Sequence, residues 1–162
     1  VAAEDLCKMY YSLYGLECVI FRYFNVYGER QPLKGQYAPV VGLFLEMKKA
    51  GKAMTVVGDG KQTRDYTYVG DVVEANILAS KTENKSALAE VYNVGTGTNH
   101  SVLDLVDLID GDHVHIPARD GEARDTKADI GKIMLDLDWY PQETIENWIA
   151  NYKKEYNIWR RK

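Results

Sequence analysis

The chain has 162 residues, of which 46% are hydrophobic and 27% are charged, so it is long enough to form the core of one ordinary globular domain. Its formal net charge of -4, without a dense run of lysine or arginine, argues against a nucleic-acid surface and favours a small-molecule partner. The two cysteines lack Cys-x-x-Cys spacing, and no apolar run reaches the roughly 20 residues that cross a bilayer. We therefore expect a soluble chain in the reducing cytoplasm, without a structural zinc ion or a membrane partner.

The chain opens inside a helical pattern. Leu6, Met9, Tyr10 and Leu13 recur at helical spacing, and Gly15 predicts the end of this helix. Because no N-terminal capping signal precedes the run, we expect the chain to be a piece of a longer protein. The apolar stripe has two interpretations, packing within the same chain, which we favour, and contact with a second copy.

Short apolar runs then alternate with helical patterns. The first run, residues 17–21, predicts a buried strand that is followed by Arg22, two aromatics and Asn25, which suits the ligand end of a strand in an α/β protein. Further strands are predicted at residues 54–60, 63–69, 91–94 and 113–116, and helices at 40–50, from 71, from 101, at 130–137 and at 144–159. This alternation predicts α/β layering.

Two helix starts carry the pattern of a capping box. Asp71 is followed three residues later by Glu74, and Ser101 is followed three residues later by Asp104. We therefore predict that Asp71 and Ser101 cap the helices that follow them.

The turn GTGTNH, residues 95–100, lies between a predicted strand and a predicted helix, where a dinucleotide fingerprint would lie. Its last position is His100 instead of the third glycine, so we favour an ordinary turn over dinucleotide binding.

Three arginines have polar neighbours in predicted loops. The planar guanidinium groups of Arg64, Arg119 and Arg124 could each donate two parallel hydrogen bonds to a phosphate. The alternative is a set of surface ion pairs with the neighbouring carboxylates of Asp65, Asp120 and Asp125.

His113 and His115 should lie on one face of a strand, as a pair of metal ligands would. The sequence offers no third ligand, so we expect the pair to face solvent and predict no metal site.

Taken together, the segments RYFNVYGERQ, TVVGDGKQTRDYTYVGDVVEA, VYNVGTG and ARDGEARDTKADIGKIMLDLDWYP resemble, in order and spacing, the C-terminal half of extended short-chain dehydrogenases that act on nucleotide sugars. The similarity covers nearly the whole chain and is strongest to enzymes like UDP-glucose 4-epimerase. It implies a Rossmann-like α/β fold with a small mixed α/β substrate-binding domain, and the cofactor NAD.

The resemblance also assigns roles to residues of these motifs. It implies that Tyr23 and Phe24 line the nicotinamide pocket and that Asn25 reaches the substrate diphosphate. It further implies that Arg64 and Arg119 neutralise this diphosphate, because each guanidinium group can donate two parallel hydrogen bonds to one phosphate.

The remaining implied contacts surround the nucleoside. Gln36 and Tyr37 match loop positions that close over the nucleotide, and Thr55 and Val57 match strand positions that hold the base. Glu122 matches a carboxylate that accepts hydrogen bonds from ribose hydroxyls.

Members of this family carry a catalytic Tyr-x-x-x-Lys pair, and Val1 matches the residue that follows its lysine. The N-terminal Rossmann half, its glycine-rich phosphate loop and this pair would then precede the chain. Without the pair, no side chain is placed to take the proton of the sugar hydroxyl. We therefore expect no catalytic residue here, and a chain that binds nucleotide sugar without transferring hydride.

The resemblance divides the chain into a remnant of the dinucleotide-binding domain, residues 1–31, and residues 32–162, which are mostly the nucleotide-sugar-binding domain with strand and helix returns to the core. It implies a homodimeric parent. Because the other half would be missing, we expect an open strand edge around residues 19–23 and self-association. Alternatives to the epimerase are a 4,6-dehydratase or decarboxylase of the same family, and a non-catalytic binding or assembly fragment.

Overall fold

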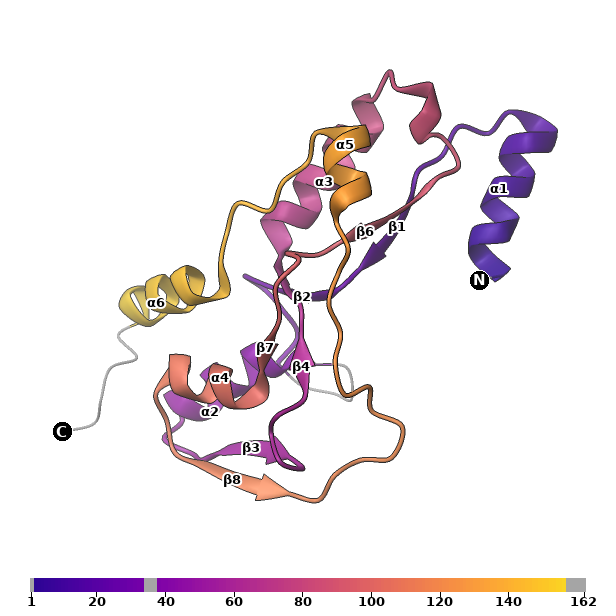
Figure 1. Ribbon diagram of the computed structural model, residues 1–162. Coiled ribbons are helices and arrows are strands. Elements are labelled where there is room, and N and C mark those ends of the chain that lie inside the picture. Colours follow the sequence, from indigo (N-terminus) through magenta and orange to yellow (C-terminus); the bar gives the residue numbers. More distant parts are fainter. Residues whose placement is uncertain (1, 34–37, 157–162) are drawn as a thin grey trace.

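The computed structural model describes residues 2–33 and 38–156, and Figure 1 shows an elongated molecule built from helices and short strands. The helices are α1 (Ala2–Tyr14), α2 (Val40–Lys49), α3 (Val69–Lys81), α4 (Val102–Ile109), α5 (Gly131–Leu137) and α6 (Ile145–Glu155), with a 3-10 turn η1 (Lys85–Ala87). The strands are β1 (Ile20–Tyr23), β2 (Asn25–Tyr27), β3 (Met54–Val57), β4 (Thr63–Arg64), β5 (Tyr66–Tyr68), β6 (Val91–Val94), β7 (His100–Ser101) and β8 (His113–Ile116).

The strands of the described residues join in pairs. β1 pairs with β6, β2 with β5 and β3 with β8, each in parallel, whereas β4 pairs with β7 in antiparallel orientation. Parallel pairing requires a crossover through other elements, and helices supply most of these connections. The predicted α/β class is therefore confirmed.

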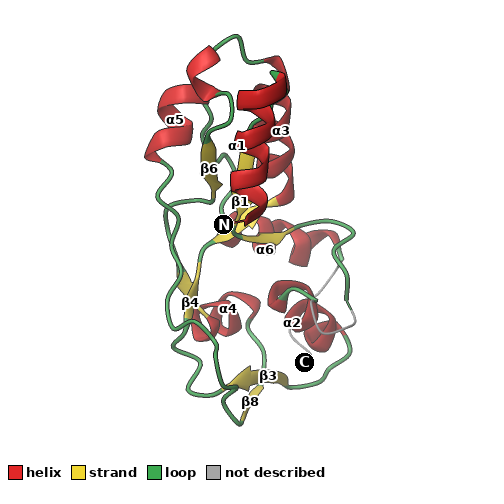
Figure 2. Ribbon diagram, turned by 90° about the vertical axis from the view of Figure 1, so that its right-hand side faces the viewer, coloured by secondary structure: helices red, strands yellow, loops and turns green. Residues whose placement is uncertain are grey.

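Two hydrophobic clusters occupy the two ends of the molecule. At one end, α3, α5, β1 and β6 pack around a cluster that includes Tyr92 and Trp139, which are each 1% exposed. At the other end, α2, α4, β3 and α6 pack around a cluster that includes Phe44, Leu105 and Trp148. Figure 1 shows β2 and β4 in the region between these ends, and Figure 2 shows β4 there as well. β1 shares the first cluster with α3 and α5, which come from the part of the chain after residue 31.

Local signals located several element ends correctly. Ser101 caps α4 in a complete capping box, in which its Oγ accepts from the Asp104 N–H at 3.0 Å and the Asp104 carboxylate accepts from the Ser101 N–H at 2.7 Å. Gly15 follows α1 with a φ of 65°, and its N–H donates to the Tyr11 carbonyl. Gly51 follows α2 with a φ of 66°. These ends depend on neighbouring residues alone, which is why the sequence predicts them.

The predicted cap at Asp71 is wrong. α3 begins at Val69, two residues earlier, and its N-cap residue Tyr68 makes no side-chain capping bond. The buried Asp71 carboxylate instead accepts from the Glu143 N–H at 3.2 Å, and the Asp71 carbonyl accepts from Trp139 Nε1 at 2.9 Å. A long-range contact has replaced the local capping bond.

The apolar stripe on α1 is exposed, so the favoured packing within the chain is wrong for the described residues. No residue of α1 is buried, and Leu6, Met9, Tyr10 and Leu13 are 43% to 64% exposed. Two hydrogen bonds join β1 to α1: Arg22 Nε donates to Glu4 Oε1 and Arg22 Nη2 donates to Glu4 Oε2, both at 2.7 Å. None of the helices in the described ranges is both long and apolar enough to cross a membrane.

Candidate functional site

A cavity of about 740 Å³ borders the second hydrophobic cluster, and we call it the central cavity. Its lining comes from β2, α2, β3, β4, β5, α4 and the segment that follows β8. It includes six of the predicted substrate-binding residues, Asn25, Thr55, Val57, Arg64, Arg119 and Glu122. Segments nearly 100 residues apart in the sequence therefore meet in one cavity.

Strand geometry explains how the first of these residues reach the cavity. Asn25 begins β2, where its N–H donates to the Asp65 carbonyl at 3.0 Å. Thr55 and Val57 alternate along β3 with the fully buried Met54 and Val56, so they share the face that borders the cavity.

The two arginines of the cavity differ in how they are held. Arg64 is half-buried, and its Nη1 donates to the carbonyls of Thr63 at 2.8 Å and Arg124 at 3.4 Å. The Arg119 side chain is 66% exposed, and its Nη1 lies 3.8 Å from the Glu122 carboxylate. Two guanidinium groups and one carboxylate thus leave a net positive charge at the cavity, which favours an anionic ligand.

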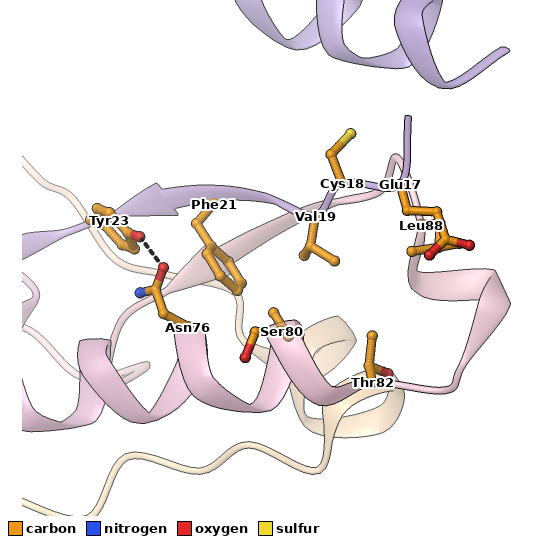
Figure 3. Close-up of a pocket in the computed structure, with 10 residues that line it drawn as sticks. Glu17, Cys18, Val19, Phe21, Tyr23, Asn76, Ser80, Thr82 and Leu88 are labelled. Carbon is orange, nitrogen blue, oxygen red and sulfur yellow. Dashed lines mark hydrogen bonds between the residues drawn. The ribbon is translucent and has the colours of Figure 1, made fainter. Parts of the chain in front are cut away.

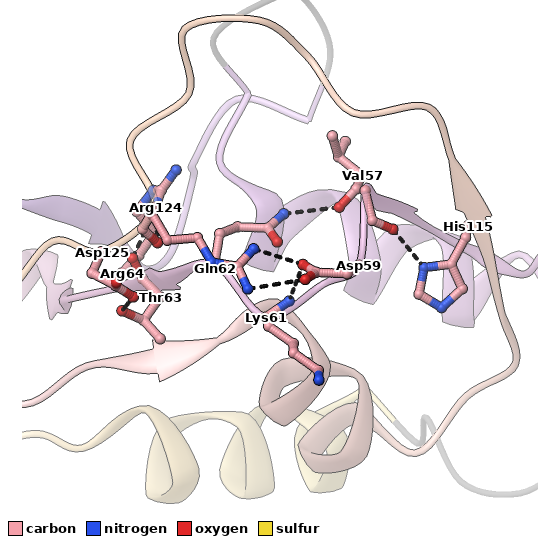
Figure 4. Close-up of polar contacts among 10 residues, drawn as sticks. Val57, Asp59, Lys61, Gln62, Thr63, Arg64, His115, Arg124 and Asp125 are labelled. Atoms are coloured by element: carbon pink, nitrogen blue, oxygen red, sulfur yellow. Dashed lines mark hydrogen bonds and ion pairs between the residues drawn. The ribbon is translucent and has the colours of Figure 1, made fainter.

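Arg124 lies outside the cavity lining. Its two terminal nitrogens donate to the Asp59 carboxylate at 2.7 and 2.9 Å, as Figure 4 shows. This hydrogen-bonded fork holds the pKa of Asp59 well below its usual range. An ion pair was the alternative predicted for the arginines, but the partner of Arg124 is Asp59 and not one of the neighbouring aspartates.

Tyr23 and Phe24, both predicted at the nicotinamide, do not share a cavity. Consecutive residues of extended backbone point in opposite directions, and only Phe24 lines the central cavity. Tyr23 faces a separate groove of about 450 Å³ between β1 and α3, where its hydroxyl donates to Asn76 Oδ1 at 3.0 Å (Figure 3).

The turn at residues 95–100 is filled by a carboxylate from its own chain. Asp65 is fully buried, and its two oxygens accept from the N–H groups of Thr96, Gly97 and Ala128 at 2.8, 2.9 and 3.1 Å. Amides that could cradle a phosphate are thereby occupied. This is consistent with the ordinary turn that we favoured over a dinucleotide site.

The two histidines of β8 are exposed, and their ring centroids are 5.4 Å apart. His115 Nδ1 lies 2.8 Å from the Gly58 carbonyl. Within residues 2–33 and 38–156 no group of three potential ligands could hold a metal ion.

Two predicted nucleotide contacts, Gln36 and Tyr37, lie outside the described residues. Sequence reasoning missed Gln62, which is 9% exposed, lines the cavity and donates to the Val57 carbonyl at 3.0 Å. Its position two residues before Arg64 in a polar turn was the only available signal. No Tyr-x-x-x-Lys spacing occurs anywhere in the 162 residues.

The fold and the cavity define an α/β protein whose central cavity carries a net positive charge and is lined by strands, by α2 and by the segment after β8. The sequence profile of the NAD dependent epimerase/dehydratase family matches residues 1–95. The chain belongs to this family.

Similar proteins extend this likeness over almost the whole chain. UDP-glucose 4-epimerase of Mycolicibacterium smegmatis is 36% identical over 156 residues, which cover 93% of this chain and 49% of that protein. UDP-N-acetyl-alpha-D-glucosaminuronate decarboxylase of Bacillus cytotoxicus is 41% identical over 102 residues, which cover 63% of this chain and 30% of that protein. The crystal structure of UDP-glucose 4-epimerase from Thermotoga maritima with UDP-glucose has a TM-score of 0.85 at 35% identity, covering 95% of this chain and 52% of that one. The chain spans about half the length of most of the relatives it matches.

Proposed function

We propose that the chain forms the nucleotide-sugar-binding part of an NAD-dependent UDP-sugar 4-epimerase. The observation that carries this proposal is the convergence of six predicted contact residues on one cavity. Arg64 and Arg119 bind the diphosphate together with the amide of Asn25. A pyrophosphate suits this arrangement because each guanidinium can donate a charge-assisted pair of hydrogen bonds.

The nucleoside occupies the part of the central cavity next to β3. Thr55 and Val57 hold the base there, and the Glu122 carboxylate accepts hydrogen bonds from the ribose hydroxyls. Gln36 and Tyr37 remain proposed contacts of the nucleotide on the strength of the family resemblance alone.

The described residues fit only one end of NAD. Phe24 lines the central cavity and is our proposed nicotinamide contact, whereas Tyr23 faces the separate groove between β1 and α3. The amides of the turn at residues 95–100 are taken by Asp65, so this turn does not hold the phosphates of NAD. When bound, NAD would accept a hydride from the sugar and return it. This chain would contribute the substrate contacts.

Two further parts of the proposal concern the chain by itself. We propose that the 162 residues bind UDP-sugars without epimerising them, because no Tyr-x-x-x-Lys pair is available to move the hydroxyl proton. A coupled assay for UDP-galactose formation tests this directly. We also propose a homodimeric parent, supported by the exposed apolar stripe on α1. The likeness to a decarboxylase keeps that activity as the alternative for the parent, and product analysis of the parent would separate the two.

Isothermal titration with UDP-glucose tests the binding proposal. We expect Arg64→Gln and Arg119→Gln each to weaken binding by about tenfold or more, because each removes a charge-assisted fork from the diphosphate. Arg30→Gln is the matched control, because Arg30 lies outside the cavity lining. Unchanged affinity in both cavity variants, or no binding at millimolar UDP-glucose, would overturn the proposal.

A further inference from the structure

The segment of residues 117–125 carries Arg119 and Glu122 to the central cavity, although most of it is exposed. At its start, the Ile116 carbonyl of β8 accepts from the Gly58 N–H at 2.9 Å. At its end, the Arg124 carbonyl accepts from the Thr63 N–H at 2.9 Å. The start of the segment is therefore attached to Gly58, directly after β3, and its end to Thr63, the first residue of β4.

A side-chain contact strengthens the second attachment. The fork from Arg124 to Asp59 ties the end of the segment to the middle of the β3–β4 turn (Figure 4). Thr63 Oγ1 also donates to the Asp125 carboxylate at 2.8 Å. Thr63, which makes this last contact, directly precedes Arg64 in the chain.

The turn that holds Asp59 is itself fixed by several contacts. Asp59 Oδ1 accepts from the Lys61 N–H at 3.0 Å, Gln62 Nε2 donates to the Val57 carbonyl, and His115 Nδ1 contacts the Gly58 carbonyl. The Asp59 carboxylate is thus an anchor whose position is set by β3 and β8.

We propose that the Asp59–Arg124 ion pair is a positioning device that holds the segment of residues 117–125 so that Arg119 and Glu122 face Arg64 across the central cavity. The inference rests on the proposed function for its ligand. Neither Asp59 nor Arg124 lines the cavity, so both act through the residues that they place. The described contacts attach the end of the segment that carries Arg119 and Glu122 to the turn that precedes Arg64.

Charge alone makes the opposite prediction for one substitution. Asp59 is a negative group near a site for an anion, so a purely electrostatic role predicts that Asp59→Asn tightens binding of a diphosphate. Positioning predicts that Asp59→Asn weakens it, because the segment loses its anchor. Arg124→Gln weakens binding under both descriptions and therefore serves only to complete the comparison.

UDP-glucose titration of Asp59→Asn, Arg124→Gln and the double variant measures this difference. We expect each single variant to lose about threefold in affinity, as for a well-formed exposed ion pair, and the double variant to lose no more than either single one. Asp107→Asn on α4 is the matched control, because Asp107 is exposed and does not line the cavity. Unchanged or tighter binding by Asp59→Asn would overturn the inference.

Amide hydrogen exchange gives a second readout that needs no ligand. The Thr63 N–H donates to Arg124 and the Thr126 N–H donates to Thr63, so both amides report on the attachment of the segment. We expect both to exchange faster in Asp59→Asn, with the amides of α4 unchanged. Should wild-type chain bind no UDP-glucose, the proposed function fails, and the exchange rates alone decide the positioning role. Unchanged exchange at both amides would then contradict it.

Discussion

Replacing the buried carboxylate of Asp65 should destabilise the chain severely without changing its shape. Asp65→Asn keeps the volume of the side chain but exchanges one acceptor oxygen for an NH₂ donor. Oδ1 accepts from the N–H and the hydroxyl of Thr96, both at 2.8 Å, and Oδ2 accepts from the N–H groups of Gly97 and Ala128. With the NH₂ group at the Oδ2 position, the N–H groups of Gly97 and Ala128 lose their acceptor. With the NH₂ group at the Oδ1 position, the Thr96 N–H loses its acceptor, whereas the Thr96 hydroxyl can accept from the amide and donate to the Thr98 carbonyl.

The expected loss follows from the backbone N–H groups that lose their acceptor and from the lost charge of the carboxylate. A buried N–H group that loses its acceptor costs about 1–3 kcal/mol, and hydrogen bonds to a charged acceptor are worth more than those to a neutral one. The site is buried, since Ala128 is 4% exposed, so we expect the free energy of unfolding to fall by about 3 kcal/mol. For a chain of this length, that change lowers Tm by roughly 6–12 °C. The Asp65 carbonyl keeps its bond from Asn25, which limits the change to the turn.

Guanidinium chloride unfolding, followed by the fluorescence of the buried Trp139 and Trp148, measures this loss. Asp107→Asn provides the control, and its free energy of unfolding should change by no more than about 0.5 kcal/mol. A loss below about 1 kcal/mol for Asp65→Asn would refute the reasoning, because it would mean that the turn does not depend on the carboxylate.

Three further predictions concern other parts of the fold. The hydrogen bonds from Arg22 lower the pKa of Glu4 to about 2 from an ordinary value of 4.5, so the stabilising contribution of this ion pair is complete above pH 4.5 and is lost as the pH falls towards 2. The protection of the α1 amides, taken relative to the intrinsic exchange rate at each pH, should fall over that range in the wild type and be low throughout in Arg22→Gln. Gly95→Ala would place a Cβ atom 2.9 Å from the Asp65 carboxylate and closer still to a neighbouring methyl group, so thermal unfolding should show a loss of about 1–3 kcal/mol, and an unchanged Tm would argue against the tight packing. Leu13 is 64% exposed on the apolar face of α1, so sedimentation should show self-association of the wild type that Leu13→Glu reduces, whereas a wild-type monomer at high concentration would contradict it.

Local patterns in the sequence predicted much of the secondary structure. The capping box of Ser101 and Asp104 and the glycine after α1 involve residues within a few positions of each other. The local sequence is therefore sufficient to predict these helix ends. The first predicted strand, residues 17–21, began too early, because β1 spans Ile20–Tyr23 and is defined by its parallel pairing with β6. Strand limits set by a distant partner are not visible in a local pattern.

For the candidate site, too, the sequence predicted some features and missed those that depend on distant parts of the chain. The resemblance to a family predicted that Asn25, Arg64 and Arg119 lie together, because members of a family share their tertiary structure. In the structure, all three residues line the central cavity. It did not reveal that Arg124 reaches Asp59, which lies 65 residues away. A surface ion pair of this kind depends on how two loops meet, and many aspartates in the chain were equally plausible partners.

The most direct test of the central proposal is a crystal structure of the chain with UDP-glucose. We expect the diphosphate in the central cavity, with its oxygens within hydrogen-bond distance of the guanidinium groups of both Arg64 and Arg119 and of the Asn25 amide. A diphosphate bound in the groove between β1 and α3, or one that contacts neither arginine, would contradict it.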